Sequence, residues 1–299
     1  MNGVFAAVLT PMKADLSPDH GALVGHCRWL LDQGCDGLSV LGTTGEANSL
    51  SVGERLDILD ALAQSEIPCQ ALLPGTGCPA LPDTVRLSRR AIEIGAPGVL
   101  MLPPFFYKNV SDDGLFASYC QVIEAVGDSR LRVYLYHFPK MSAVPINLSL
   151  IERLLKRYPE VIAGVKDSSG DLANMTAMVR AFPGFKVFSG SDEAFLPLLK
   201  EGGAGCVTAF CNVAPQLAAR VYGKRSEEAS QRITQVRMTV SAYPQIAALK
   251  AVMAHYAKDK SWLNIRPPLT RLSDDQAQAL FKALDGIGFA PPPPPEPAL

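Results

Sequence analysis

A lysine follows an apolar run in the segment VIAGVKDSSG, residues 161–170. A run composed of Val, Ile, Ala and Gly is typical of a strand that is buried on both faces of a parallel sheet. Burying an unpaired ammonium group there costs on the order of several kcal/mol. Lys166 therefore either ends the strand and reaches solvent, or it is a buried amine with a chemical task.

Other apolar runs also end in polar or aromatic residues. These endings are GTTGE (42–46), PPFFY (103–107), YHFPK (136–140) and GSDE (190–193). The GTTGE segment presents the hydroxyls of Thr43 and Thr44 and several backbone N–H groups between two glycines, an arrangement that can hold a small carboxylate. Taken alone, this segment is also compatible with an ordinary turn that leads into a helix.

Lys166 and Tyr136 together suggest covalent chemistry on a ketone. A neutral amine between apolar walls can attack a carbonyl carbon, and a nearby hydroxyl can move protons while a carbinolamine forms and loses water. Tyr136 alone would be read as an aromatic residue of the core. The combination with the GTTGE hydroxyls favours a site in which the amine attacks the carbonyl carbon of a ketone.

Eight short apolar runs alternate with eight longer amphipathic segments as far as about residue 224. This alternation predicts an α/β fold, a (β/α)8 TIM barrel whose active site lies at the carboxyl ends of the strands. An open doubly wound sheet is the alternative, but no G-x-G-x-x-G or G-x-x-x-x-G-K-[ST] motif opens a helix. The predicted strands are residues 3–11, 37–42, 69–75, 98–104, 132–139, 161–167, 185–192 and 204–210.

Helix signals and the C-terminal sequence complete the predicted organisation. Ser51 and Glu54 have the spacing of a capping box, and Gly34, Gly95 and Gly127 follow helical segments. We therefore expect a catalytic barrel at 1–224 and a C-terminal helical domain at 225–289. The proline-rich tail at 290–299 predicts an exposed, disordered segment.

Composition excludes several classes of function. The 28 Lys and Arg residues nearly balance the 29 Asp and Glu residues, so we expect neither a nucleic-acid partner nor an anionic membrane partner. No signal peptide and no membrane-spanning run is recognisable, which favours the cytoplasm. The seven cysteines lack a C-x-x-C pair and the four histidines are scattered, so we predict neither a disulfide framework nor a metal site.

These motifs resemble the dihydrodipicolinate synthase and N-acetylneuraminate lyase family over residues 3 to about 285. The similar features are GTTGE, Y-x-x-P, G-[VI]-K-[DQ]-[ST], the acidic turn after the seventh strand and the RPP at 266–268. The resemblance implies a class I aldolase without a cofactor, in which Lys166 forms a Schiff base with pyruvate or another 2-oxo acid and Tyr136 moves the proton. Thr43 would link Tyr136 to Tyr107, which would reach in from a neighbouring subunit of a homotetramer. The residues implied to bind or line the substrate site are Thr44, Gly190 and Val207.

One position departs from the dihydrodipicolinate synthase pattern. These enzymes place an arginine two residues after the proline of the fifth strand's motif, where it binds the carboxylate of aspartate semialdehyde, but here that residue is Met141. A methionine cannot form a bidentate contact with a carboxylate, and Lys140 points elsewhere by alternation. This departure argues against aspartate semialdehyde as the substrate.

The acidic pair at 192–193 suggests a different substrate class. Asp192 and Glu193 match the residues with which sialic acid lyases contact sugar hydroxyls, and His137 could add a polar contact. A hydroxylated 2-oxo acid of the 2-keto-3-deoxy sugar acid type is then the expected substrate, with pyruvate and an aldehyde as products. Alternatively, the two carboxylates only begin a helix, where its dipole favours negative charge.

Three other functions stay open on the sequence alone. A sugar-acid dehydratase would use the same Schiff base to release water. A true 4-hydroxy-tetrahydrodipicolinate synthase would need another residue in place of the missing arginine. A sensor barrel would bind a 2-oxo acid without turnover, although the presence of Lys166, Tyr136 and Thr43 together argues against it.

Overall fold

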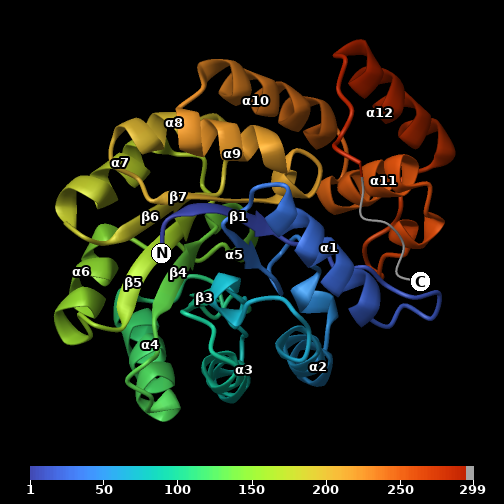
Figure 1. Cartoon of the computed structure of the whole chain (residues 1–299). Coiled ribbons are helices and arrows are strands. Elements are labelled where there is room, and N and C mark those ends of the chain that lie inside the picture. Colours follow the sequence, from blue (N-terminus) through green and yellow to red (C-terminus); the bar gives the residue numbers. More distant parts are fainter. Residues whose placement is uncertain (294–299) are drawn as a thin grey trace.

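The computed structural model describes residues 1–293 of the chain, and residues 294–299 lie outside the described part. Seven parallel strands form one sheet that curls into a barrel, with the strand order β2-β1-β7-β6-β5-β4-β3 (Figure 1). The strands are β1 (Gly3–Ala7), β2 (Gly37–Ser39), β3 (Val99–Met101), β4 (Val133–His137), β5 (Ile162–Asp167), β6 (Lys186–Ser189) and β7 (Gly205–Thr208).

The third of the eight predicted strands, at 69–75, does not form a regular strand. Its first part is a 3-10 turn, Cys69–Ala71, and only the residues that follow pair with both neighbours. The amide of Leu73 donates to Leu38, and the amide of Leu100 donates to Pro74, both at 2.8 Å. Because Pro74 has no N–H, one bond of the ladder toward β3 is missing. The segment still closes the barrel between β2 and β3, which confirms the predicted (β/α)8 fold.

Most strands end earlier than predicted. The first run was expected to extend to residue 11, but β1 ends at Ala7, and the fifth was expected to extend to residue 139, but β4 ends at His137. The apolar and aromatic residues beyond these ends belong to the loops above the barrel. Hydrophobic pattern alone does not separate a buried strand from the buried loop that continues it.

Eight helices surround the barrel, each following one of the eight strand positions (Figure 1). They are α1 (His20–Asp32), α2 (Val52–Ala63), α3 (Leu81–Glu93), α4 (Asp112–Val126), α6 (Leu148–Arg157), α7 (Leu172–Ala181), α8 (Asp192–Lys200) and α9 (Pro215–Lys224). A single short turn, α5 (Pro139–Ser142), lies above β4. The predicted capping box of Ser51 and Glu54 begins α2, and Gly127 ends α4 with a φ of 64°.

The C-terminal extension consists of α10 (Glu227–Ser241), α11 (Gln245–Ala257) and α12 (Asp274–Gly286). Helix α10 packs against α8 and α9, while α11 packs against α10, α12 and the turn that follows β7. Figure 1 shows α12 on the outside of this group. The division of the chain at residue 224 stays a prediction. No helix among residues 1–293 has the length and apolar composition needed to cross a membrane.

The barrel interior is filled by large side chains. Phe5 and Phe188 meet edge to face with ring centroids 5.6 Å apart, and Tyr134 contacts Phe188 in the same way at 5.9 Å. Tyr136 belongs to this buried cluster and lies two residues further along β4, nearer the carboxyl end of the strand. The packed interior therefore supports the ring of Tyr136 from below.

The predicted tail begins within the described part, where the carbonyl of Pro293 accepts a hydrogen bond from the Trp29 indole.

Candidate active site

Lys166 is buried at the carboxyl end of β5, with 5% of its surface exposed. Its register partner on β4 is Tyr136. The amine donates to the Tyr136 hydroxyl across 3.2 Å and lies 4.3 Å from the centre of the same ring. Within residues 1–293 this hydroxyl is the amine's only side-chain hydrogen-bond partner, and no carboxylate forms an ion pair with it.

Thr43 extends this contact into a chain of three polar groups. Its hydroxyl lies 3.4 Å from the hydroxyl of Tyr136, and either oxygen can donate. The ring of Tyr136 also stacks on Phe138, with centroids 5.8 Å apart, which restricts its rotation. A proton can therefore pass between the amine, the phenol and the threonine hydroxyl through neighbouring groups.

The GTTGE loop lies close against the segment that follows β1 and presents backbone donors. The hydroxyl of Thr10 donates to the carbonyl of Gly45 at 2.8 Å. A Cβ at Gly45 would lie 2.8 Å from the carbonyl oxygen of Val8, so only glycine allows this approach. In the part of the chain that the structure describes, the amides of Thr44 and Gly45 have no acceptor. These donors are suited to a carboxylate.

The C-terminal extension holds this loop from above through Glu46. The Glu46 carboxylate forms an ion pair with Lys250 of α11, and both side chains are almost completely buried. The backbone amide of Arg266 donates to the same carboxylate at 3.2 Å, and Lys250 also donates to the carbonyl of Asn264 at 2.7 Å. Burial lowers the pKa of Lys250, although the charge of Glu46 opposes this shift.

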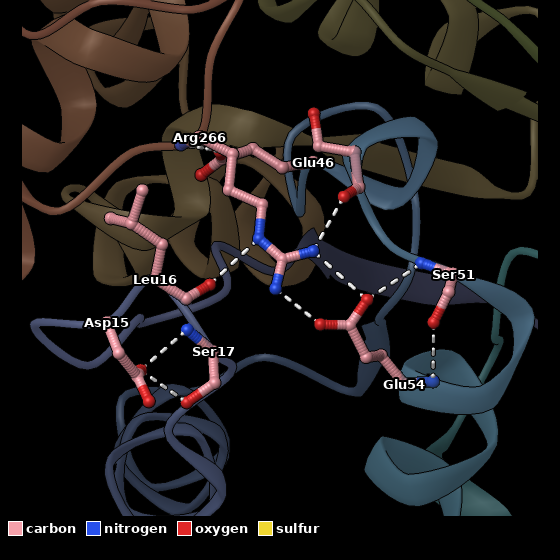
Figure 2. A network of polar contacts seen from close by, with 8 residues as sticks. Asp15, Leu16, Ser17, Glu46, Ser51, Glu54 and Arg266 are labelled. Carbon is pink, nitrogen blue, oxygen red and sulfur yellow. Dashed lines mark hydrogen bonds and ion pairs between the residues drawn. The ribbon is translucent and has the colours of Figure 1, made fainter.

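Arg266, the arginine of the RPP motif, joins the same region to the start of α2. Figure 2 shows its guanidinium group between Glu54 and the carbonyl of Leu16. Both carboxylate oxygens of Glu54 accept from it, and the carbonyl of Ser49 accepts at 2.7 Å. The bond from Arg266 is the main reason that the pKa of Glu54 falls to about 2. The motif therefore fixes the segment between the GTTGE loop and the capping box.

A cavity of about 470 Å³ opens above these residues, a size in the range of small-molecule sites. Its barrel side contains six of the predicted site residues, and its other side is formed by the C-terminal extension. A larger groove of about 830 Å³ between α2, α3 and α4 is lined by arginine, glutamate, one glutamine and apolar residues, none of which is a nucleophile. The predicted residues in the 470 Å³ cavity are Thr43, Thr44, Tyr136, Lys166, Gly190 and Val207.

Comparison with known proteins agrees with this geometry. Residues 1–287 match the Dihydrodipicolinate synthetase family. The chain belongs to this family. A protein of Chloroflexus aurantiacus described as an uncharacterized DapA-like lyase is 36% identical over 293 residues, which cover 95% of this chain and 96% of that protein. The predicted resemblance is thus confirmed, and with it the prediction of a lyase of this family.

Solved structures show the same architecture. Dihydrodipicolinate synthase from Agrobacterium tumefaciens superimposes with a TM-score of 0.91 at 28% identity, covering 96% of this chain and 99% of that one. A prophage protein of E. coli K12 from the same family, solved in complex with pyruvate, has a TM-score of 0.86 at 25% identity, with the same coverage. Similarity to both extends over the barrel and the extension.

A close approach between two family motifs shapes one wall of the cavity. A Cβ at Gly190 would lie only 2.0 Å from the hydroxyl oxygen of Ser168. Ser168 follows Lys166 and Asp167 in the GVKDS motif and also lines the cavity, although our sequence analysis did not single it out. Any larger residue at position 190 would displace the segment that follows the lysine.

Tyr107 lies apart from the other predicted site residues. It is 74% exposed in the loop between β3 and α4, where its ring packs edge to face against Phe106. Within one chain it does not line the cavity. This placement neither tests nor excludes the predicted contact with a neighbouring subunit, which stays a prediction.

Asp192 and Glu193, which we expect to contact the substrate, are not among the residues that line the cavity. Asp192 is fully buried at the start of α8, where one oxygen accepts from Thr208 at 2.9 Å and from Arg237 at 3.1 Å. Glu193 accepts from Nε of Arg237 at 3.0 Å. Arg237, which contacts both carboxylates, lines the cavity. The acidic turn of the family is therefore connected to the cavity by Arg237.

Burial raises the pKa of Asp192 despite the nearby charge of Arg237. Partial burial would also raise the pKa of Glu193, but the bond from Ser191 and the charge of Arg237 outweigh it and lower that pKa. Glu193 is therefore a carboxylate at neutral pH.

The remaining candidates can be placed as well. Met141 of α5 lines the cavity and is 64% exposed, so no guanidinium group stands at that position. His137 does not line the cavity, because its Nδ1 accepts from the amide of Ile146 at 3.0 Å. Lys140 lies on the surface beside Gly170 and does not line the cavity. No group of three metal-binding side chains occurs among residues 1–293.

Proposed function

We propose that this protein is a class I aldolase in which Lys166 forms a Schiff base with the C2 carbonyl of a 2-oxo acid. The observation that carries the proposal is the buried amine of Lys166, 3.2 Å from the Tyr136 hydroxyl and without an ion-pair partner among residues 1–293. Desolvation in an apolar pocket is one way in which a lysine amine becomes a nucleophile. The contrast with Lys250, which is equally buried but paired with Glu46, supports this role.

Cleavage begins when the neutral amine adds to C2 of the substrate and the carbinolamine loses water to give an iminium ion. Tyr136 gives the proton with which this water leaves, and the resulting phenolate takes the proton of the C4 hydroxyl. The C3–C4 bond then breaks, and its electron pair moves toward the iminium to form an enamine. An aldehyde leaves. The enamine then takes a proton at C3, and water hydrolyses the iminium to pyruvate and free Lys166. Condensation of pyruvate with an aldehyde is the reverse sequence.

The other lining residues support these steps. Thr43, 3.4 Å from Tyr136, relays the proton and holds the phenol in place. Thr44 and the free amides of the GTTGE loop hold the carboxylate next to the reacting carbonyl. Gly190 and Val207 leave room for the carbon chain. Pyruvate, which has six non-hydrogen atoms, would fill only part of the cavity, so space remains for the rest of a longer substrate.

The proposed substrate is a hydroxylated 2-oxo acid of the 2-keto-3-deoxy sugar acid type. Met141 supports this class, because the position where a dihydrodipicolinate synthase carries its carboxylate-binding arginine holds a thioether here. The products would be pyruvate and a hydroxylated aldehyde.

The proposed assembly is a homotetramer in which Tyr107 completes the site of a neighbouring subunit. Support comes from exposed apolar side chains around this loop: Phe106, Tyr107, Val110 and Met141. Lys108 ties the loop to α5 by donating to the carbonyl of Ser142 at 2.8 Å. Sedimentation velocity of the wild type and of Tyr107→Phe tests this proposal, and a fully active monomer would exclude it.

A substrate panel tests the proposed reaction. Purified protein is incubated with 2-keto-3-deoxy sugar acids of five and six carbons, and the products are identified by mass spectrometry. The proposal predicts equimolar pyruvate and aldehyde from at least one compound. Release of water with the carbon chain intact would show a dehydratase instead, and no turnover of any compound would favour a binding protein.

A further inference from the structure

Arg237 of α10 connects the acidic turn after β6 with the cavity. Its Nη1 donates to Asp192 at 3.1 Å and its Nε pairs with Glu193 at 3.0 Å. The guanidinium carbon lies 5.4 Å from the centre of the Phe210 ring. These contacts fix the plane of the group, and Arg237 is also one of the residues that line the cavity.

One edge of the guanidinium group is left for a ligand. In the described part of the chain, Nη2 of Arg237 has no acceptor. Most neighbouring lining residues on this side are apolar, among them Ile246, Ile265 and Leu269. A planar donor surrounded by apolar groups can select where a polar atom of the substrate lies.

The charge around this donor is balanced. Glu193 is ionised, and Asp192 contributes either no charge or a second negative charge according to its protonation. The group of Arg237, Asp192 and Glu193 therefore carries a net charge of zero or minus one, never plus one. Such a group donates hydrogen bonds without attracting an anion, so it fits a hydroxyl group better than a second carboxylate.

We propose that Arg237 selects the distal part of the substrate by donating to the hydroxyl groups of an uncharged polyol chain. Asp192 and Glu193 are positioning residues that hold the guanidinium group and cancel its charge. This inference rests on the proposed function, because it concerns the part of the same substrate that lies beyond the reacting carbons. It excludes substrates with a distal carboxylate as the preferred class.

The test compares two substrates of equal length. 2-Keto-3-deoxygluconate ends in a hydroxymethyl group, and the corresponding 2-keto-3-deoxyhexarate ends in a carboxylate. We expect the wild type to prefer the former in kcat/KM by at least about tenfold, the discrimination that about 1.4 kcal/mol provides. Equal values, or a preference for the hexarate, would overturn the proposal.

Two variants locate the preference in Arg237. Arg237→Met should lower kcat/KM for 2-keto-3-deoxygluconate by about 10- to 150-fold, the range for losing a hydrogen bond from a charged donor. Arg237→Lys keeps a cation beside Asp192 in case the methionine variant is unstable, and it should also lose at least about tenfold because lysine lacks the planar donor edge. A loss below about threefold in both variants would overturn the proposal.

Glu193→Gln tests the charge balance. Removing one negative charge should reduce the preference for 2-keto-3-deoxygluconate over the hexarate by roughly tenfold. This ratio does not depend on the fraction of folded enzyme. Arg220→Met is the matched control for Arg237→Met, because Arg220 pairs with Glu228 on the surface and does not line the cavity. An unchanged ratio in Glu193→Gln would contradict the role given to Glu193.

Trapping of pyruvate with borohydride separates this inference from the proposed function. If wild type and Arg237→Met both form the adduct but the substrate preference is absent, only the role of Arg237 fails. If neither protein forms an adduct, the Schiff-base function fails.

Discussion

Glu46 and Lys250 form an ion pair between the substrate-binding loop and the C-terminal extension, and both side chains are almost completely buried. Glu46 adopts a left-handed backbone conformation with a φ of 56°, which a residue other than glycine rarely adopts. The pair fixes this conformation, because leaving either charge alone in the interior is costly. Helix α11 thereby positions the hydroxyls of Thr43 and Thr44 without contacting the substrate through Lys250.

Replacing Lys250 should lower the stability of the folded protein. Lys250→Met leaves Glu46 buried without its partner, and we expect the free energy of unfolding to fall by about 3–5 kcal/mol. Urea denaturation followed by circular dichroism measures this loss. The control is Lys200→Met, which removes an exposed partner of Glu227 and should cost about 1 kcal/mol or less. Equal effects of the two variants would show that the buried pair has no special role.

Because the side chain of His26 is buried, we expect the folded protein to lose stability in mild acid. Burial lowers the pKa of His26 from 6.5 to about 4, and its Nδ1 has no partner among residues 1–293, while Nε2 lies 2.8 Å from Asn212. Because the unfolded chain binds a proton at higher pH than the folded one, stability is complete above about pH 6.5 and falls as pH drops toward 4. At about pH 4 the pKa shift of His26 corresponds to a loss of about 3 kcal/mol in the free energy of unfolding.

His26→Phe should remove this part of the pH dependence. Urea denaturation at pH 7.5, 5.5 and 4.5 provides the measurement. His255→Phe, at an exposed position on α11, controls for the replacement of a histidine by phenylalanine. A wild-type pH slope in His26→Phe would mean that another group causes the acid sensitivity.

The alternation of apolar runs and amphipathic segments predicted the barrel, and the resemblance of the motifs to a known family predicted the six residues that cluster in the cavity. Lys166 and Lys250 show the limit of such patterns, since each is a lone lysine in an apolar run, and only the three-dimensional structure gives Lys250 a carboxylate partner. Arg237 was missed because it lies on a helix with no distinctive motif, 45 residues from Asp192. Tyr107 could not be assigned to the cavity, because the site that it is predicted to complete belongs to a neighbouring subunit.

Tyr136→Phe should retain the fold and the Schiff base but lose turnover by about 10²- to 10⁴-fold, the usual contribution of a positioned acid–base group. Steady-state kinetics with the best substrate of the panel measures the loss. Tyr134→Phe is a matched control on the same strand, because its hydroxyl accepts from the N-terminal amine of Met1 instead of contacting Lys166. Near-normal turnover of Tyr136→Phe would remove this tyrosine from the mechanism.

Met141→Arg should raise the activity toward aspartate semialdehyde. The side chain of residue 141 lines the cavity, so an arginine there could form the charge-assisted pair that the wild type lacks. Such a contact is worth on the order of 2–5 kcal/mol, or roughly 30- to 5,000-fold in kcat/KM. Both substrate types are measured side by side in wild type and variant. Efficient condensation by the wild type, above about 10⁴ M⁻¹s⁻¹, would contradict our substrate argument.

Covalent trapping at Lys166 tests the central claim most directly. Wild type, Lys166→Arg and the control Lys140→Arg are treated with borohydride in the presence of pyruvate, and the adduct is mapped by peptide mass spectrometry. We predict one adduct per chain on Lys166 in the wild type and in Lys140→Arg, and none in Lys166→Arg, because a guanidinium group stays protonated and cannot attack the carbonyl. An adduct on another residue, or none in the wild type, would contradict the Schiff-base mechanism.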